Sequence, residues 1–423
     1  MTFHGTADVV AAHPSDVRDG EVPFDFGEIF FSRTDDRGVI QAGNAVFRRV
    51  SGYEGSRLIG APHRIVRHPL MPKAAFHLLW ERLKAGRATG VYVCNRALDG
   101  RAYCVFAVVV PVGEGFLSVR IKPGTAMFDR VRAVYAELLA AEAQGATPAE
   151  GAADLMLRLK AAGFPGYDSF QAQALAAELA HRAERAGFPA PALAPAVNSA
   201  RAADRIAASI APVRDMLRKA LHIAINLRIV AGHLGSNGRA LGAIADNYAS
   251  LSRDLSGWIE HQSAAGAFAG IAGAAGENLF LKAATGLLDE MAETFARDAE
   301  AGLGDPAAER ERLSAAAAIY RGRAQECNER AARMALDLEA QLAQMRHRIN
   351  ALDAIRMQCR VEGAATAGAG GELDHIVAQL DRFQDEMGGR LTEIMSHGRD
   401  IQEAAAATDA RLVPRPVAHA LRI

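Results

Sequence analysis

The chain has 423 residues, which is too long for one compact core and favours about two or three domains. It carries 48 Lys and Arg against 49 Asp and Glu, a formal net charge of −1, which excludes a strong overall attraction to nucleic acid or anionic lipid. The 4 cysteines are widely spaced and form no CxxC pair, a pattern typical of free thiols in a reducing compartment. These features favour a cytoplasmic protein.

Residues 1–23 lack the basic start and apolar core of a secretory signal, so we expect a disordered tail there. The nearest candidate for a membrane span, residues 263–281, is mostly Ala and Gly and includes Glu277. We therefore expect this stretch to be a close-packed helix and the chain to have no membrane span.

Residues 24–122 have the pattern of an α+β domain. Short β-like runs at 27–35, 91–98, 102–112 and 116–122 flank a central stretch suited to short helices. Turn signals at 35–38, 98–101 and 113–115 lie where these strands should reverse. The last three strands are therefore predicted to form consecutive antiparallel hairpins.

After Pro123 the composition changes to Ala, Glu, Arg and Leu, with almost no β-branched runs, so the rest of the chain is predicted to be helical. Pro and Gly breaks at 145–151, 163–167 and 187–196 mark residues 123–199 as a helical connector. A longer helical region then covers residues 200–410, and residues 411–423 form a C-terminal tail.

Residues 200–410 contain a repeat in which an apolar heptad pattern returns after 132 residues. The first copy has Ile206, Ile210, Val213, Leu217, Ala220, Ala224 and Leu227. The second has Leu338, Leu342, Met345, Ile349, Leu352, Arg356 and Cys359, of which all but Arg356 are apolar. The register continues from Leu241–Gly257 to Leu373–Gly389. A Gly-rich turn lies between the two apolar halves of each copy, at 231–242 in the first and at 362–373 in the second. Each copy is therefore predicted to be an antiparallel helical hairpin.

Two such hairpins in one polypeptide supply the helices of a four-helix bundle. We expect the two apolar stripes to pack within one chain as an intramolecular pseudo-dimer. The alternative, which the same heptads permit, is that each hairpin pairs with its counterpart in a second chain.

The most specific local signal is residues 51–86, SGYEGSRLIGAPHRIVRHPLMPKAAFHLLWERLKAG, preceded by QAGNAVF at 41–47. This segment resembles the PAS domain of bacterial aerotaxis receptors, whose pattern has an Asn in the first helix, then SGY, G-x-P-H, V-R-H-P-x-M-P-K-A-A-F and a Trp four residues on. The resemblance implies a five-stranded antiparallel sheet with short helices over residues 24–122. It also implies that the domain holds FAD.

The residues that the family uses to retain FAD match Asn44, Arg67, His68 and Trp80, and Asn95 offers a further amide. Trp80 is suited to stack on the ring system and Arg67 to donate to the pyrophosphate, while His68 can donate and titrate. Taken singly, a Trp at this spacing also suits a core and an Arg also suits a helix cap. The chain has Ala88 and Thr89 where the family often supplies another aromatic residue, so part of the pocket should differ.

Haem b is the competing cofactor, because His63, His68 and His77 fall in the portion that supplies axial ligands in other PAS domains. No spacing selects one of them. Flavin–cysteinyl photochemistry is not expected, since Cys94 precedes Asn95 on a predicted strand rather than lying in a helix. A PAS domain without any cofactor is the remaining alternative.

Residues 226–252 resemble the hairpin tip of methyl-accepting chemotaxis proteins in a degenerate form. The matching residues are Asn226, Ile229, Ala231, Gly235, Gly238, Arg239, Ala245, Asp246 and Leu251. The resemblance implies a chemotaxis histidine kinase or its coupling protein as partner. Val230 and His233 replace a Glu and an Arg of the face that contacts those partners, which leaves kinase binding open.

No pairing of nucleophile and base, phosphate loop, metal spacing or paired-carboxylate motif supports an enzyme. We therefore expect a soluble redox-responsive or oxygen-responsive signal transducer that passes the state of a bound flavin to a helical output bundle. The alternative is a cofactor-free or haem-binding PAS scaffold in chemotaxis or other signalling.

Overall fold

The computed structural model describes residues 20–113, 115–233, 235–264, 266–297, 303–365 and 370–409. These residues form two compact units. The first unit comprises the described residues of Met1–Ala162, Phe170–Leu193 and Leu279–Ala324, and the second those of Gly163–Ser169, Ala194–Asn278 and Gln325–Ile423.

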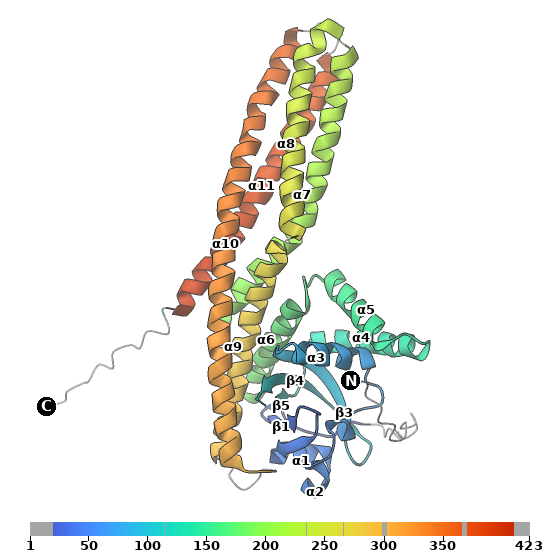
Figure 1. Cartoon of the computed structure of the whole chain (residues 1–423), viewed down its shortest axis with the longest axis vertical. Helices are drawn as coiled ribbons and strands as arrows, with labels where there is room; N and C mark the ends of the chain where they lie inside the picture. Colours follow the sequence, from blue (N-terminus) through green and yellow to red (C-terminus); the bar gives the residue numbers. More distant parts are fainter. Residues whose placement is uncertain are drawn as a thin grey trace, which may run out of the picture. The chain divides into compact units, whose positions relative to one another are not determined.

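The first unit is built on a five-stranded antiparallel sheet in the order β2-β1-β5-β4-β3 (Figure 1). Its strands are β1 (Phe30–Asp35), β2 (Ile40–Gly43), β3 (Thr89–Arg96), β4 (Ala102–Val112) and β5 (Gly115–Ile121). The last three strands form consecutive hairpins, as predicted. The sheet with short helices, followed by a long all-helical region, confirms the predicted fold class.

Short helices lie between β2 and β3 in the chain. They are α1 (Ala45–Ser51), α2 (Gly55–Leu58), the 3-10 helix η2 (His63–Val66) and α3 (Lys73–Lys84). Asn44 caps α1, and Gly52, with a φ of 70°, ends it in the left-handed region that a side chain would disfavour. Helix α3 buries Ala75, Leu79 and Leu83, which are spaced by four residues and therefore share one face.

The two faces of the sheet carry different side chains, because neighbours on a strand point to opposite sides. On β5, Leu117, Val119 and Ile121 point to one face, and Phe116, Ser118 and Arg120 point to the other. Helices cover the face that Phe31 and Tyr92 occupy. Phe31 packs edge-on against Phe295 of α9 (Ala267–Arg297), and Tyr92 stacks on Phe128 of α4 (Ala126–Ala143).

Helices α5 (Pro148–Ala161) and α6 (Tyr167–Ala186) follow α4. The carboxylate of Glu178 on α6 is fully buried. It accepts hydrogen bonds from Tyr92 Oη at 2.8 Å, Thr125 Oγ1 at 2.6 Å and the Gly124 backbone N–H at 2.8 Å. These bonds fasten α6 to strand β3 and to the segment that leaves the sheet.

The second unit is helical, and its described helices share a hydrophobic core. Its elements are α7 (Ala194–His233), the 3-10 turn η3 (Gly235–Gly238), α8 (Arg239–Ala264), the first part of α9, the later part of α10 (Pro306–Ala365) and α11 (Gly370–Asp409). Residues of α7, α8, α10 and α11 share this core, and the four helices run side by side (Figure 1). Four helices of a single chain therefore bury their apolar stripes together.

The predicted heptad positions point into this core. All those named for the first copy, from Ile206 to Leu227, are buried, as are Leu338, Leu342, Met345 and Ile349 of the second copy. The chain reverses between α7 and α8 at the Gly-rich turn, as predicted. The side chains of Leu352, Arg356, Cys359 and Leu373 lie outside those that the structure describes, as does the second turn at 366–369.

The expectation of free thiols is wrong for one pair of cysteines. Cys94 on β3 and Cys104 on β4 form a disulfide, with a Cα–Cα separation of 4.0 Å. They face each other directly in the ladder, which brings the two Cβ atoms within reach of a bond. Cys327 is a free, buried thiol, and burial raises its pKa to about 12.

Among the described residues, the stretch Arg239–Arg297, which holds α8 and α9, is long and apolar enough to pass a test for a membrane span. Of its most apolar window, 62% is buried inside the protein. The test considers only length and composition, and a buried core helix also passes it.

Candidate functional site

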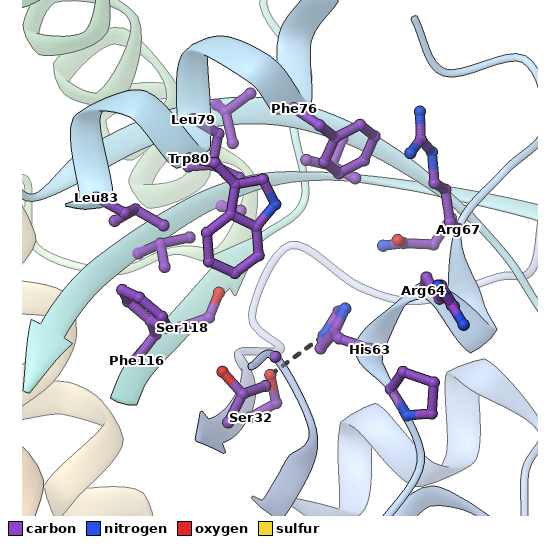
Figure 2. Close-up of a pocket in the computed structure, with 18 of the residues that line it drawn as sticks. Ser32, His63, Arg64, Arg67, Phe76, Leu79, Trp80, Leu83, Phe116 and Ser118 are labelled. Atoms are coloured by element: carbon purple, nitrogen blue, oxygen red, sulfur yellow. Dashed lines mark hydrogen bonds between the residues drawn. The ribbon is translucent and has the colours of Figure 1, made fainter. Parts of the chain in front are cut away.

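A cavity of about 490 Å³ lies in the first unit, between α3 and the face of the sheet opposite Phe31 and Tyr92. Phe76, Leu79, Trp80 and Leu83 line it from one face of α3 (Figure 2). The sheet contributes Val91, Val93, Ala107, Val109 and Phe116. The Trp80 and Phe116 rings meet edge to face, with centroids 5.3 Å apart. These walls suit a flat, largely apolar group.

The charged residues of the cavity wall all have the same sign. Five are cationic, namely Arg37, Arg64, Arg67, Lys73 and Arg120, and none of the described lining residues carries a carboxylate. The side chains of Arg37, Arg64 and Lys73 are exposed, so they border the opening, whereas Arg120 is buried. This electrostatic arrangement favours an anionic ligand.

Arg67 and Asn95 are neighbours on the wall, because their backbones pair in an isolated antiparallel bridge. The Arg67 guanidinium lies 4.1 Å from the centroid of the Phe76 ring, and its Nη2 donates to the carbonyl of Met71 at 3.3 Å. Burial lowers the pKa of Arg67 from its usual value, and Glu142 acts in the opposite direction. The remaining N–H groups of this guanidinium are oriented by the ring and by the carbonyl.

A second polar cluster centres on Arg120, which is only 6% exposed. Its Nη2 donates to Ser32 Oγ at 2.8 Å and lies 2.8 Å from His63 Nε2. Burial lowers the pKa of Arg120 to about 10, so the side chain is cationic at neutral pH. Its Nη1 is buried and has no hydrogen-bond partner among the described residues, and the same is true of Ser118 Oγ.

His63 is neutral in this cluster. Burial and the neighbouring Arg120 lower the pKa of His63 to about 3. Because Nε2 faces a guanidinium donor, it acts as the acceptor, and the ring proton lies on Nδ1. Ser32 Oγ lies 3.4 Å from the same nitrogen (Figure 2). The net charge of the cluster is therefore that of Arg120 alone.

Of the five residues that the sequence indicated for a cofactor, the structure brings Arg67, Trp80 and Asn95 together on the cavity wall. Asn44 is not on this wall. Its Oδ1 accepts from the backbone N–H groups of Phe31 and Phe47, at 3.0 and 3.1 Å, and its Nδ2 donates to the Ile29 carbonyl at 2.7 Å. The Asn44 amide thus joins α1 to strand β1.

His68 also lies off the cavity wall. Its Nδ1 accepts from the Leu70 backbone N–H at 3.2 Å, and its buried Nε2 has no hydrogen-bond partner in the part of the chain that the structure describes. Burial lowers the pKa of His68, and the positive charge of Arg96 lowers it further. Of the other histidines considered for haem, His63 lines the cavity with Nε2 held by Arg120, and His77 lines it with an exposed side chain.

Sequence reasoning missed Ser32, Phe76, Phe116, Ser118 and Arg120 as site residues. The signal for the last three was present in the strand pattern. Between Phe116 and Ile121 the apolar residues Leu117, Val119 and Ile121 occupy one face, so the alternate positions had to point to the other. A strand that is buried on both faces and places Ser and Arg on one of them indicates a polar cavity there. No group of three or more His, Cys, Asp or Glu among the described residues is arranged to hold a metal ion.

No family model matches the chain. The aerotaxis receptor of Escherichia coli (strain K12) is 35% identical to it over 134 residues. The matched stretch makes up 30% of this chain and 26% of the receptor, so the chain spans about a quarter of that relative's length. The protein is therefore a partial relative of an aerotaxis receptor.

Proposed function

We propose that the chain is a PAS-type sensor that binds FAD in the cavity beneath α3 and passes the redox state of the flavin to its helical region. The observation that carries this proposal is a cavity with flat apolar walls and five cationic residues, without a carboxylate among the described lining residues. FAD combines a planar ring system with an anionic diphosphate, which is the combination that such a wall suits. The partial similarity to an aerotaxis receptor supports the same function.

In this proposal each part of the wall has its own task. Phe76, Trp80 and Phe116 enclose the ring system, and Asn95 offers its amide to a polar edge of the ring. Arg67 donates to the diphosphate, assisted by the exposed cations at the opening. When bound, FAD supplies a reversible change of charge and hydrogen bonding on reduction.

The signal would leave the cavity through strand β3. Val91 and Val93 line the cavity, whereas Tyr92 between them points to the opposite face and donates to Glu178 of α6. A displacement of β3 would reach α6 through this hydrogen bond and through the one that the Gly90 backbone N–H donates to Gln171 Oε1 at 3.0 Å. The output is a shift in helical packing, by which a cytoplasmic, non-enzymatic transducer would act on a chemotaxis histidine kinase or its coupling protein.

The absorption spectrum of the purified full chain, recorded oxidised and after dithionite, tests the cofactor. We expect flavin bands that bleach on reduction. A Soret band would indicate that the cofactor is haem. A colourless protein that takes up no added FAD would favour a cofactor-free scaffold.

Two pairs of variants test the site. The chain has 2 tryptophans, so Trp80→Ala should lower the FAD content of the folded protein severalfold, while Trp258→Ala on α8 should leave it unchanged. Arg67→Ala should weaken FAD binding about tenfold or more, since a hydrogen bond to a charged group contributes about 1.5 to 3 kcal/mol. The exposed Arg57, which contacts the Tyr53 ring, provides the control Arg57→Ala. Full FAD occupancy in both site variants would contradict the assignment.

A further inference from the structure

Arg120 is a buried cation that the described part of the chain does not neutralise. The groups that face it are Ser32, neutral His63 and the ring of Phe47, whose centroid is 5.7 Å from the guanidinium carbon. Tyr103 also interacts with it, but burial raises the pKa of that phenol, which keeps it neutral. No salt bridge joins Arg120 to a described carboxylate, and its Nη1 remains without a hydrogen-bond partner.

A purely structural role does not explain this arrangement. Burial of a charge without a counter-charge costs several kcal/mol, and an apolar side chain of similar length is often as stable or more stable at such a position. Arg33, on the neighbouring strand β1, shows how the charge of an arginine is usually neutralised. Its side chain forms an ion pair with both carboxylate oxygens of Glu309 at 3.0 Å. Arg120 has no such partner, although its free N–H groups lie on the wall of the cavity.

We propose that Arg120, with Ser118 beside it, binds an electron-rich polar group of the ligand at the buried end of the cavity. This inference rests on the proposed function where the ligand is FAD. The exposed cations at the opening suit the diphosphate, so Arg120 would bind a polar edge of the flavin ring system. A buried guanidinium there favours the reduced ring, which carries more negative charge than the oxidised ring.

The guanidinium fork matters as well as the charge. One amino group, Nη2, is already directed at Ser32 and His63, which holds the side chain in place and leaves Nη1 for the ligand. A lysine at this position would keep the charge but supply a single flexible donor group. Arg120→Lys therefore separates the effect of charge from that of geometry.

The first test compares stability and binding in Arg120→Met. We expect the ligand-free full chain to unfold at the same or a higher temperature than wild type, while its affinity for FAD falls at least tenfold. The matched control Arg33→Met should do the opposite, lowering the unfolding temperature and leaving FAD affinity within twofold of wild type. Unchanged FAD affinity in Arg120→Met would overturn the proposal.

The second test measures the midpoint potential of bound FAD, a quantity that a structural role would not shift systematically. We expect the order wild type, then Arg120→Lys, then Arg120→Met, from the highest potential to the lowest. If Arg120→Met does not fold, Arg120→Lys decides the matter. A Lys variant whose FAD affinity equals that of wild type would show that the fork does not contact the ligand.

A third test applies if wild type binds no FAD, an outcome that removes the proposed cofactor but not the role of Arg120. The ligand-free protein is then titrated with benzoate and with benzamide, which share a ring and differ in charge. Benzoate should raise the unfolding temperature of wild type more than benzamide does, and Arg120→Met should lose this difference. Equal responses to both probes in wild type would reject the inference.

Discussion

The two faces of the sheet each bury a charged side chain that forms no salt bridge within the described residues. Arg120 lies on the cavity face and Glu178 against the opposite face, and they are 6% and 0% exposed. Glu178 accepts hydrogen bonds from Tyr92, Thr125 and the Gly124 backbone, so its oxygens are well satisfied. Arg120 leaves a donor without a partner.

This difference indicates that Glu178 has a structural role and that Arg120 is a ligand-binding group. A buried charge whose hydrogen bonds are complete holds together the elements that supply those bonds. A buried charge with an unused donor beside a cavity is positioned to bind a group that the described residues do not supply. Substitutions on the helix-covered face should therefore change stability, and substitutions on the cavity face should change ligand binding.

The largest expected effect on stability is that of Glu178→Ala. Loss of the carboxylate leaves the buried Tyr92 hydroxyl without its acceptor and also removes the acceptor of the less buried Thr125 and Gly124, so the free energy of unfolding should fall by about 3 kcal/mol. Urea unfolding followed by Trp80 emission, in a Trp258→Phe background, reports on the first unit alone. The exposed Glu184 on the same helix gives the control Glu184→Ala. A change of less than about 0.5 kcal/mol in Glu178→Ala would remove the distinction between the two faces.

A smaller effect on the free energy of unfolding should follow from the depressed pKa of His63, and it should depend on pH. Between pH 6.5 and about 3 the unfolded chain binds a proton at His63 and the folded chain does not. Stability from this group is therefore complete above pH 6.5 and is lost as the pH falls, by about 1.4 kcal/mol for each pH unit at most.

His63→Gln keeps an acceptor for Arg120 and does not titrate. It should reduce the loss of stability between pH 7 and pH 5 by about 1 to 2 kcal/mol, measured by the same unfolding curves. His68→Gln, measured in parallel, separates the contribution of His68, whose pKa is also lowered by burial. An identical pH dependence in wild type and His63→Gln would show that His63 is protonated in the folded protein.

An effect on stability of similar size is expected from the Cys94–Cys104 disulfide. The crosslink spans a sequence separation of 10 and restricts the unfolded chain, so Cys94→Ala/Cys104→Ala should lower the free energy of unfolding by about 2 kcal/mol. FAD affinity should stay the same, because the lining residues of β3 and β4 point to the other face. A thiol reductant should destabilise wild type by the same amount and leave the double variant unaffected.

The sequence predicted the fold class because alternation and heptad spacing depend only on neighbours along the chain. The disulfide was not predicted, because it depends on the register between strands β3 and β4. A two-residue turn at Asp99 and Gly100 would place Cys94 opposite Val105. The observed loop closes with Ala97 N–H donating to the Arg101 carbonyl, and Gly100 takes a φ of 93°, so the register moves by one residue and Cys94 meets Cys104.

The candidate site was predicted in part for a similar reason. Arg67, Trp80 and Asn95 were identified from the motif and lie together on the wall. Asn44 belongs to the same motif, yet its amide is used by backbone groups, a distinction that only the packing of α1 on β1 reveals. Arg120 lies outside the motif, and its place on the wall depends on how β5 pairs with β1 and β4.

The unpaired guanidinium of Arg120 also bears on how much of the protein a cell retains. A ligand that binds only the folded chain raises the free energy of unfolding by about 2.7 kcal/mol when its concentration is a hundredfold above Kd. The ligand-free chain lacks this contribution and spends more time unfolded, where proteases act on it. The abundance of the protein would then follow the supply of its ligand, and a cell short of that ligand would lose the protein together with its signal.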